Sequence, residues 1–131
     1  MVGLAFQDHR FEEGEHQLDG GNVPWNTFAI WDVRSLSLVG FLPVSDGPVE
    51  GVQGGVEEVI TISLLQSLRP ETSRATLVRL PGSSNPWAAD WNDPERIRWH
   101  QEKMASKVSR PLTQMKELNL KFGRVRHESE N

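Results

Sequence analysis

The chain has 131 residues and 37% of them are hydrophobic, so it is long enough for one domain with a single core. It contains no cysteine, which excludes disulfide scaffolds, thiolate zinc sites and cysteine nucleophiles. The net charge of −4 argues against non-specific nucleic-acid binding, and no apolar run approaches the roughly 20 residues that span a bilayer. We therefore expect a single domain over residues 1–131, in the cytoplasm, with neither a nucleic-acid partner nor a membrane span.

Residues 1–21 are predicted to be an acidic lead-in that wraps the surface of a core formed by residues 22–128. The segment has little apolar periodicity and lacks the basic and apolar regions of a signal peptide. His9 and His16 lie among its carboxylates, but their spacing is not that of a familiar metal site, and solvated charge is the favoured interpretation. The sequence therefore predicts no metal site, and it identifies no cofactor.

Residues 26–44, "NTFAIWDVRSLSLVGFLPV", predict either two short extended segments around a tight turn or a strand followed by a short helix. Three of their apolar side chains fall near one face: Phe28, Ile30 and Val33. Trp31, inside the same apolar run, is expected in the core. Residues 45–55 hold four glycines and one proline, which predicts a flexible loop.

Residues 56–70 predict a helix with a broad buried face. Val56, Ile60 and Leu64 recur at helical spacing, and Pro70 ends the pattern. The next segment, residues 74–80, places apolar residues among polar neighbours, which predicts a strand that ends at a Pro-Gly turn.

The C-terminal part of the chain predicts two helices and a strand. Asp93 suits an N-cap and Pro94 suits the first helical position. A stripe at helical spacing follows, formed by Ile97, Gln101, Met104 and Val108. We expect a second helix over residues 109–118 and a terminal strand over residues 118–128, broken by Gly123. Basic residues outnumber acidic ones in this part; such a face suits a phosphate ligand, although interspersed charges more often form a solvated surface.

The predicted order is extended hairpin, glycine loop, helix, strand, helices and short strand. We therefore expect a mixed α/β (α+β) fold with a small sheet of about three or four strands packed against about two or three helices. A sheet of this size is expected to be incomplete and to leave an apolar surface exposed.

Glu57 and Glu58 stand where the glycine-rich loop gives way to the helix. Carboxylates in the first helical turn complement the positive end of the helix dipole, by about 0.3–1 kcal/mol each, and this alone explains their presence. Alternatively, two neighbouring like charges backed by a hydrophobic helix raise the pKa of one carboxylate and suit it to act as a general base.

The order of segments in residues 22–82 resembles the acceptor-side half of inverting glycosyltransferases of the GT-A fold. The resemblance rests on "NTFAI" as a first strand, "VGF" as a Gly-Phe turn, the acidic pair that opens a helix, and "ATLVRL" as the next strand. It implies that Glu58, beside Glu57, deprotonates an acceptor hydroxyl and that residues 45–55 form a lid. The nucleotide-sugar half of such enzymes carries an Asp-x-Asp motif, which this sequence lacks, so we expect no activity from the chain alone.

Two loop tryptophans, Trp87 and Trp91, are the predicted sugar platforms. Indole faces stack on the apolar faces of sugar rings, and the polar loop around them favours exposure. Asp46 and Asn26 complete the predicted substrate-binding set.

Two functions from different classes stay open. The first is a glycosyltransferase-like fragment, or a separated acceptor-side half, that binds a sugar or nucleotide-sugar and needs a partner chain for the missing half. The second is a non-catalytic binding or assembly module that oligomerises or docks a protein partner through an exposed apolar surface.

Overall fold

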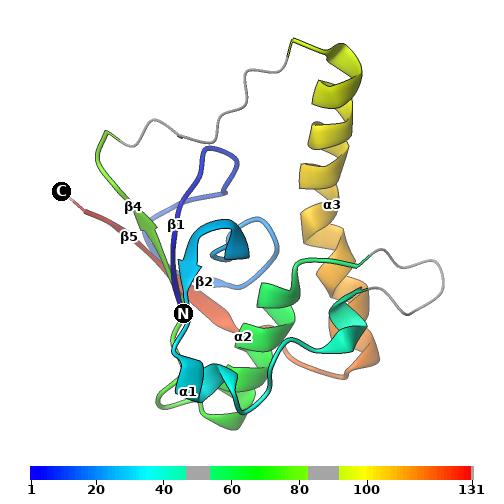
Figure 1. The fold of residues 1–131 in the computed structure, drawn as a ribbon. Coiled ribbons are helices and arrows are strands. Elements are labelled where there is room, and N and C mark those ends of the chain that lie inside the picture. Colours follow the sequence, from blue (N-terminus) through cyan, green and yellow to red (C-terminus); the bar gives the residue numbers. More distant parts are fainter. Residues whose placement is uncertain (47–53, 83–91, 131) are drawn as a thin grey trace.

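A computed structural model describes residues 1–46, 54–82 and 92–130 (Figure 1). These residues form a mixed α/β fold around one sheet with the strand order β2-β5-β4-β1-β3. The strands are β1 (Val2–Leu4), β2 (Gly14–Gln17), β3 (Ala29–Ile30), β4 (Thr76–Arg79) and β5 (Arg124–Ser129). The predicted fold class is confirmed, but the sheet has five strands where about three or four were expected.

The described residues form three α-helices beside the sheet, α1 (Val33–Leu36), α2 (Glu57–Leu68) and α3 (Pro94–Glu117), and two short 3-10 helices, Asn26–Phe28 and Pro43–Asp46. The central strands β1, β4 and β5 are parallel, whereas β2 and β3 are antiparallel edges. The connection from β1 to β4 passes through α2, and the connection from β4 to β5 passes through α3. Both crossovers step in the same direction, so right-handed connections place both helices on one face, as Figure 1 shows.

The lead-in differs from the surface wrap that the sequence predicts. β1 lies inside the sheet between β3 and β4, β2 forms the opposite edge, and Leu18 is fully buried. These strands have only three and four residues, too few for a recognisable alternation of apolar and polar side chains. Backbone pairing with β4 and β5 holds them in place.

The segment after the lead-in follows the strand-plus-helix alternative, because β3 leads directly into α1. Asp32 caps α1, and its carboxylate accepts a hydrogen bond from the Arg34 backbone N–H at 3.0 Å. The predicted apolar face does not pack inward: Phe28, Ile30 and Val33 are all exposed.

The core lies between α2 and the helix-covered face of the sheet. The helix predicted over residues 56–70 and the strand predicted over residues 74–80 are both present, as α2 and β4. Ile60 of α2 is fully buried, as are Leu77 of β4 and, almost completely, Val125 of β5. These side chains belong to one hydrophobic cluster.

One continuous helix, α3, replaces the two helices predicted after residue 93. Asp93 caps it by accepting a hydrogen bond from the Glu95 N–H at 3.0 Å, and Pro94 starts it, as expected. Pro111 lies inside the helix without ending it. Its buried residues, Pro111, Gln114 and Met115, all lie in the C-terminal part, and the N-terminal part projects past the sheet (Figure 1).

Candidate functional site

The acidic doublet is held in a hydrogen-bond network by Asn26. Glu58 Oε1 accepts from the Asn26 backbone N–H at 2.6 Å, and Glu57 Oε1 accepts from the Asn26 side-chain amide at 2.9 Å. The amide oxygen of Asn26 accepts in turn from the indole N–H of Trp31 at 2.9 Å. The structure therefore brings together three of the predicted site residues and connects them to an indole.

Glu58 is the buried member of the doublet, with 6% of its surface exposed. Burial raises the pKa of its carboxyl group, while the hydrogen bond from Asn26 opposes that shift. Val56, at the N-cap of α2, has a φ of 65° and supplies no side-chain cap. Glu58 thus places a carboxylate at a helix end that otherwise lacks a side-chain acceptor.

Lys107 of α3 is the cation near this carboxylate, and sequence reasoning did not identify it. Its Nζ lies 3.3 Å from the centroid of the Trp25 ring, a cation–π contact. Burial lowers the pKa of Lys107 to about 8, and the nearby charge of Glu58 opposes part of this shift. The sequence gives no signal for this pair, because the two residues meet only through the packing of α3 on α2.

The Trp25 ring is also covered by His9, whose ring centroid lies 3.6 Å away. His9 is buried, so the interpretation of this histidine as solvated charge is wrong. Its contact with Trp25 spans 16 positions of the chain and leaves no local pattern. His16 stays half-buried, with its ring 4.6 Å from that of His127.

The remaining predicted binding residues lie outside the described part of the structure. Trp87 and Trp91 belong to residues 83–91, and most of the predicted lid falls in residues 47–53. The side chain of Asp46 is likewise not described. Trp31 is half-buried and packs edge-on against Phe41, which agrees only partly with its expected core position.

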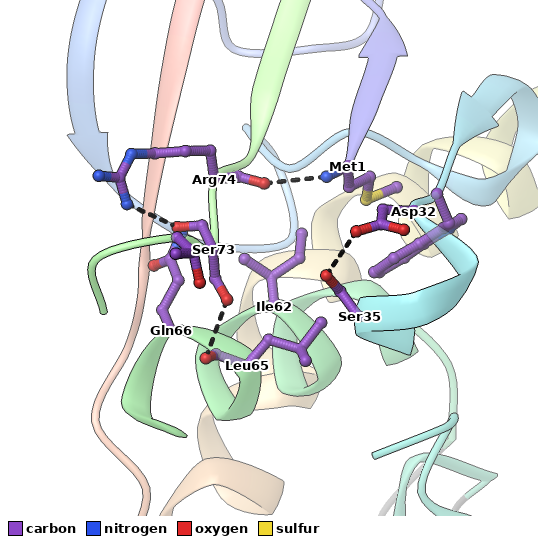
Figure 2. Close-up of a pocket in the computed structure, with 10 residues that line it drawn as sticks. Met1, Asp32, Ser35, Ile62, Leu65, Gln66, Ser73 and Arg74 are labelled. Atoms are coloured by element: carbon purple, nitrogen blue, oxygen red, sulfur yellow. Dashed lines mark hydrogen bonds between the residues drawn. The ribbon is translucent and has the colours of Figure 1, made fainter. Parts of the chain in front are cut away.

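A small pocket of about 150 Å³ lies between α1 and the start of β4 (Figure 2). Figure 2 shows Ser35 donating to the Asp32 carboxylate and Ser73 donating to the Leu65 carbonyl. This volume is below the roughly 300–1,000 Å³ of ordinary ligand pockets. A second cavity of about 610 Å³, which we call the basic groove, lies beside the first residues of β4 and β5. Neither cavity is lined by the acidic doublet.

The sheet face opposite α2 and α3 has no described helix over it, and we call it the open face. The strand register places ten side chains on it: Val2, Leu4, Glu15, Gln17, Ile30, Thr76, Val78, Arg124, Arg126 and Glu128. Gly3 and Leu77, which alternate with them, are buried on the helix side. The sheet is therefore covered on one face and bare of described helices on the other.

No protein-family model matches the chain, and neither a curated protein nor a solved structure does. The glycosyltransferase resemblance therefore stays a prediction. In the described part of the chain, no helix combines the length and the apolar character that crossing a bilayer requires.

Proposed function

We propose that this protein is a small non-catalytic assembly module that forms a symmetric dimer through its open face. The observation that carries the proposal is the placement of α2 and α3 on the same side of the sheet. Parallel sheets in proteins are ordinarily covered on both faces, because each face exposes apolar side chains that water solvates poorly. A second copy of the chain supplies the missing layer.

One half of the open face, over β3, β1 and the end of β4, is apolar. Ile30 and Val2 are register partners on neighbouring strands and are 72% and 46% exposed. Leu4 and Val78 pair in the next row and are half-buried. Exposed apolar side chains that adjoin in this way, rather than scattering singly, mark interaction surfaces.

The other half, over β5 and β2, carries charges of both signs in an order that favours a second copy as the occupant. Arg124, Arg126 and Glu128 follow one another at every second position of β5. A two-fold axis running across the strands reverses the strand direction of the partner. It therefore sets Arg126 of each copy against Glu128 of the other and packs the two apolar halves together.

The size of the face sets the expected affinity. Five strands spaced about 4.8 Å apart form a sheet only about 20 Å wide. A face of this width buries an area at the low end of the range for protein–protein interfaces. We therefore expect a reversible dimer with a dissociation constant of about 1–100 µM.

Sedimentation velocity over a concentration series tests the proposal. We expect Ile30→Asp to abolish the dimer, whereas Ile97→Asp, which changes an exposed apolar residue of α3, should leave it intact. Arg126→Glu should weaken association, and adding Glu128→Arg should restore it by exchanging the two signs. A chain that stays monomeric up to millimolar concentration, or that dimerises equally well as Ile30→Asp, overturns the proposal.

The glycosyltransferase-like function is the second candidate. It is favoured by a raised-pKa carboxylate, Glu58, in a network that reaches the Trp31 indole. Uridine- and guanosine-diphosphate sugars that bind the native chain should raise its melting temperature, and Glu58→Gln should reduce that rise. If millimolar nucleotide-sugar leaves the melting temperature unchanged, the result contradicts this candidate and leaves the dimer proposal unaffected.

A further inference from the structure

The basic groove is the larger of the two cavities described above, at about 610 Å³. It lies at the amino-terminal ends of β4 and β5 and is bordered by the C-terminal part of α2. Five charged side chains line it: Arg74, Lys121, Arg124, Arg126 and Glu15. Four cations against one anion make a strongly positive site in a chain whose net charge is −4.

Two of these cations have carboxylate partners that are easily exchanged. Arg124 pairs with Glu15 at 2.9 Å and Arg126 pairs with Glu128 at 2.7 Å. All four side chains are more than half or about half exposed, and pairs of this kind contribute only about 0–1 kcal/mol. An incoming anion therefore displaces these carboxylates at little cost.

The other two cations are not neutralised by described carboxylates. Arg74 donates from its guanidinium to the carbonyl oxygens of Pro70 at 2.8 Å and Glu71 at 2.9 Å, which orients the group but leaves its charge uncompensated. Lys121 is exposed and forms no ion pair with any residue that the structure describes. The groove thus holds two positive charges available to a ligand.

The wall between α2 and β5 is fixed by a reciprocal clamp. The Gln66 side chain donates to the Arg124 carbonyl at 2.9 Å and accepts from the Arg124 N–H at 2.7 Å. Ser63 Oγ accepts from the Gly123 N–H at 3.0 Å. A Cβ at position 123 would lie 2.5 Å from the Gln66 side-chain oxygen, so a larger residue there would push Gln66 out of this clamp. A clamped wall keeps the groove open before a ligand arrives.

We propose that the basic groove binds a small organic anion that carries a phosphate or carboxylate group. Lys121 and Arg74 hold the anionic group, and Phe122 and Pro70, which also line the cavity, contact the apolar body of the ligand. The volume falls within the roughly 300–1,000 Å³ range of small-molecule sites, which favours a compact ligand. Lys121 and Arg74 lie outside the open face, whereas Glu15, Arg124 and Arg126 belong both to that face and to the groove.

Binding of AMP, with adenosine as the probe that lacks the phosphate, tests the groove by isothermal titration calorimetry at low salt. We expect AMP to bind and adenosine not to bind. Lys121→Glu should weaken AMP binding about tenfold or more, whereas Lys103→Glu, the same charge change on α3 away from the groove, should have little effect. Inorganic phosphate and citrate, used as competitors, distinguish phosphate from carboxylate preference, and displacement by either supports the site.

Equal binding of AMP and adenosine overturns the proposal, because the phosphate then contributes nothing to affinity. Equal losses of affinity in Lys121→Glu and Lys103→Glu also overturn it, because the effect is then one of overall protein charge and not of the groove. Lys121→Gln, which alters the surface least, should give an intermediate loss and excludes a folding defect as the cause. The same titration in the Ile30→Asp chain should retain AMP binding, because Lys121 and Arg74 lie outside the open face, and this separates a failure of the groove from a failure of the dimer.

Discussion

The carboxylate of Glu58 joins two segments that are 32 positions apart in the sequence. It accepts the Asn26 backbone N–H and lies in the first turn of α2, so it fixes the chain leading into β3 against the helix. A buried charge is expensive, and its cost is reduced here by that hydrogen bond, by the helix end and by Lys107. The residue explains local architecture whether or not it acts on a ligand.

Substitutions of Glu58 separate its hydrogen bond from its charge. Glu58→Ala leaves the Asn26 N–H without its acceptor and should lower the free energy of unfolding by about 1–3 kcal/mol. Glu58→Gln keeps an acceptor and removes the charge. Because burial raises the folded-state pKa above the unfolded value, the stability that Glu58 contributes is complete below the unfolded pKa and is lost as pH rises through the folded pKa.

Urea unfolding of the wild type and of Glu58→Gln at several pH values checks this sign. The Gln variant should gain stability relative to the wild type as pH rises above the ordinary Glu value of 4.5. A difference between the two chains that does not change with pH contradicts the raised pKa.

His9 should make the protein sensitive to acid. Its Nδ1 accepts from the Phe6 N–H at 2.8 Å, so Nε2 carries the proton and donates to the Val23 carbonyl at 3.0 Å. Burial lowers the pKa of this neutral ring from 6.5 to about 4, and the nearby charges of Lys107 and His127 act in the same direction. The stability that it contributes is therefore complete above the unfolded pKa and is lost as pH falls toward 4, by about 3 kcal/mol at most.

Proton NMR of the His9 ring measures this pKa directly, and unfolding of His9→Gln measures its consequence. The variant should lose most of the pH dependence between 6.5 and 4 that His9 causes. A His9 resonance that titrates near 6.5 contradicts the burial of an unprotonated ring.

At the scale of elements, a glycine and a proline determine how closely α3 approaches the lead-in. Pro111 has no N–H, so the Lys107 carbonyl lacks its usual helical donor four residues on. That carbonyl faces Gly20, where a Cβ would overlap the oxygen. Both residues allow the same contact: the Lys107 carbonyl, which has no helical donor, packs directly against the backbone of Gly20.

Gly20→Ala should therefore move α3 or strain the contact, and we expect a loss of about 2–4 kcal/mol in the free energy of unfolding. Gly21→Ala is the matched control. A Cβ there lies 3.3 Å from the Asp19 carboxylate and 3.5 Å from Val108, which asks for a small adjustment only. Denaturant unfolding compares the two, and a loss for Gly20→Ala no larger than that for Gly21→Ala contradicts the close approach.

The elements that sequence reasoning found are those with strong local signals. Helix α2 has a long apolar stripe ended by Pro70, and the start of α3 has the Asp93 and Pro94 pair. The very short strands β1 and β2 carry no such signal, and their positions depend on pairing with strands that follow more than 70 residues later. Asn26 was identified as a site residue, whereas Lys107 required the packing of two helices.

At the scale of the whole molecule, the topology explains why one face stays open. The parallel strands are ordered β1, β4, β5 without reversal, so every right-handed crossover deposits its helix on the same side. A doubly wound fold reverses direction and covers both faces. The described residues supply a helix layer on one face only, and the bare face is thus a consequence of strand order rather than of strand number.

A dimer through the open face makes the thermal stability of the whole molecule depend on protein concentration. Association stabilises only the folded chain, so the melting temperature should rise between about 5 µM and about 500 µM. For a dissociation constant in the proposed range the gain is about 1 kcal/mol per chain, or about 3–5 °C for a protein of this size. Ile30→Asp should remove the dependence, and Ile97→Asp should keep it. A melting temperature that is equal at both concentrations in the unmodified chain contradicts association, since no linkage then exists between folding and the second copy.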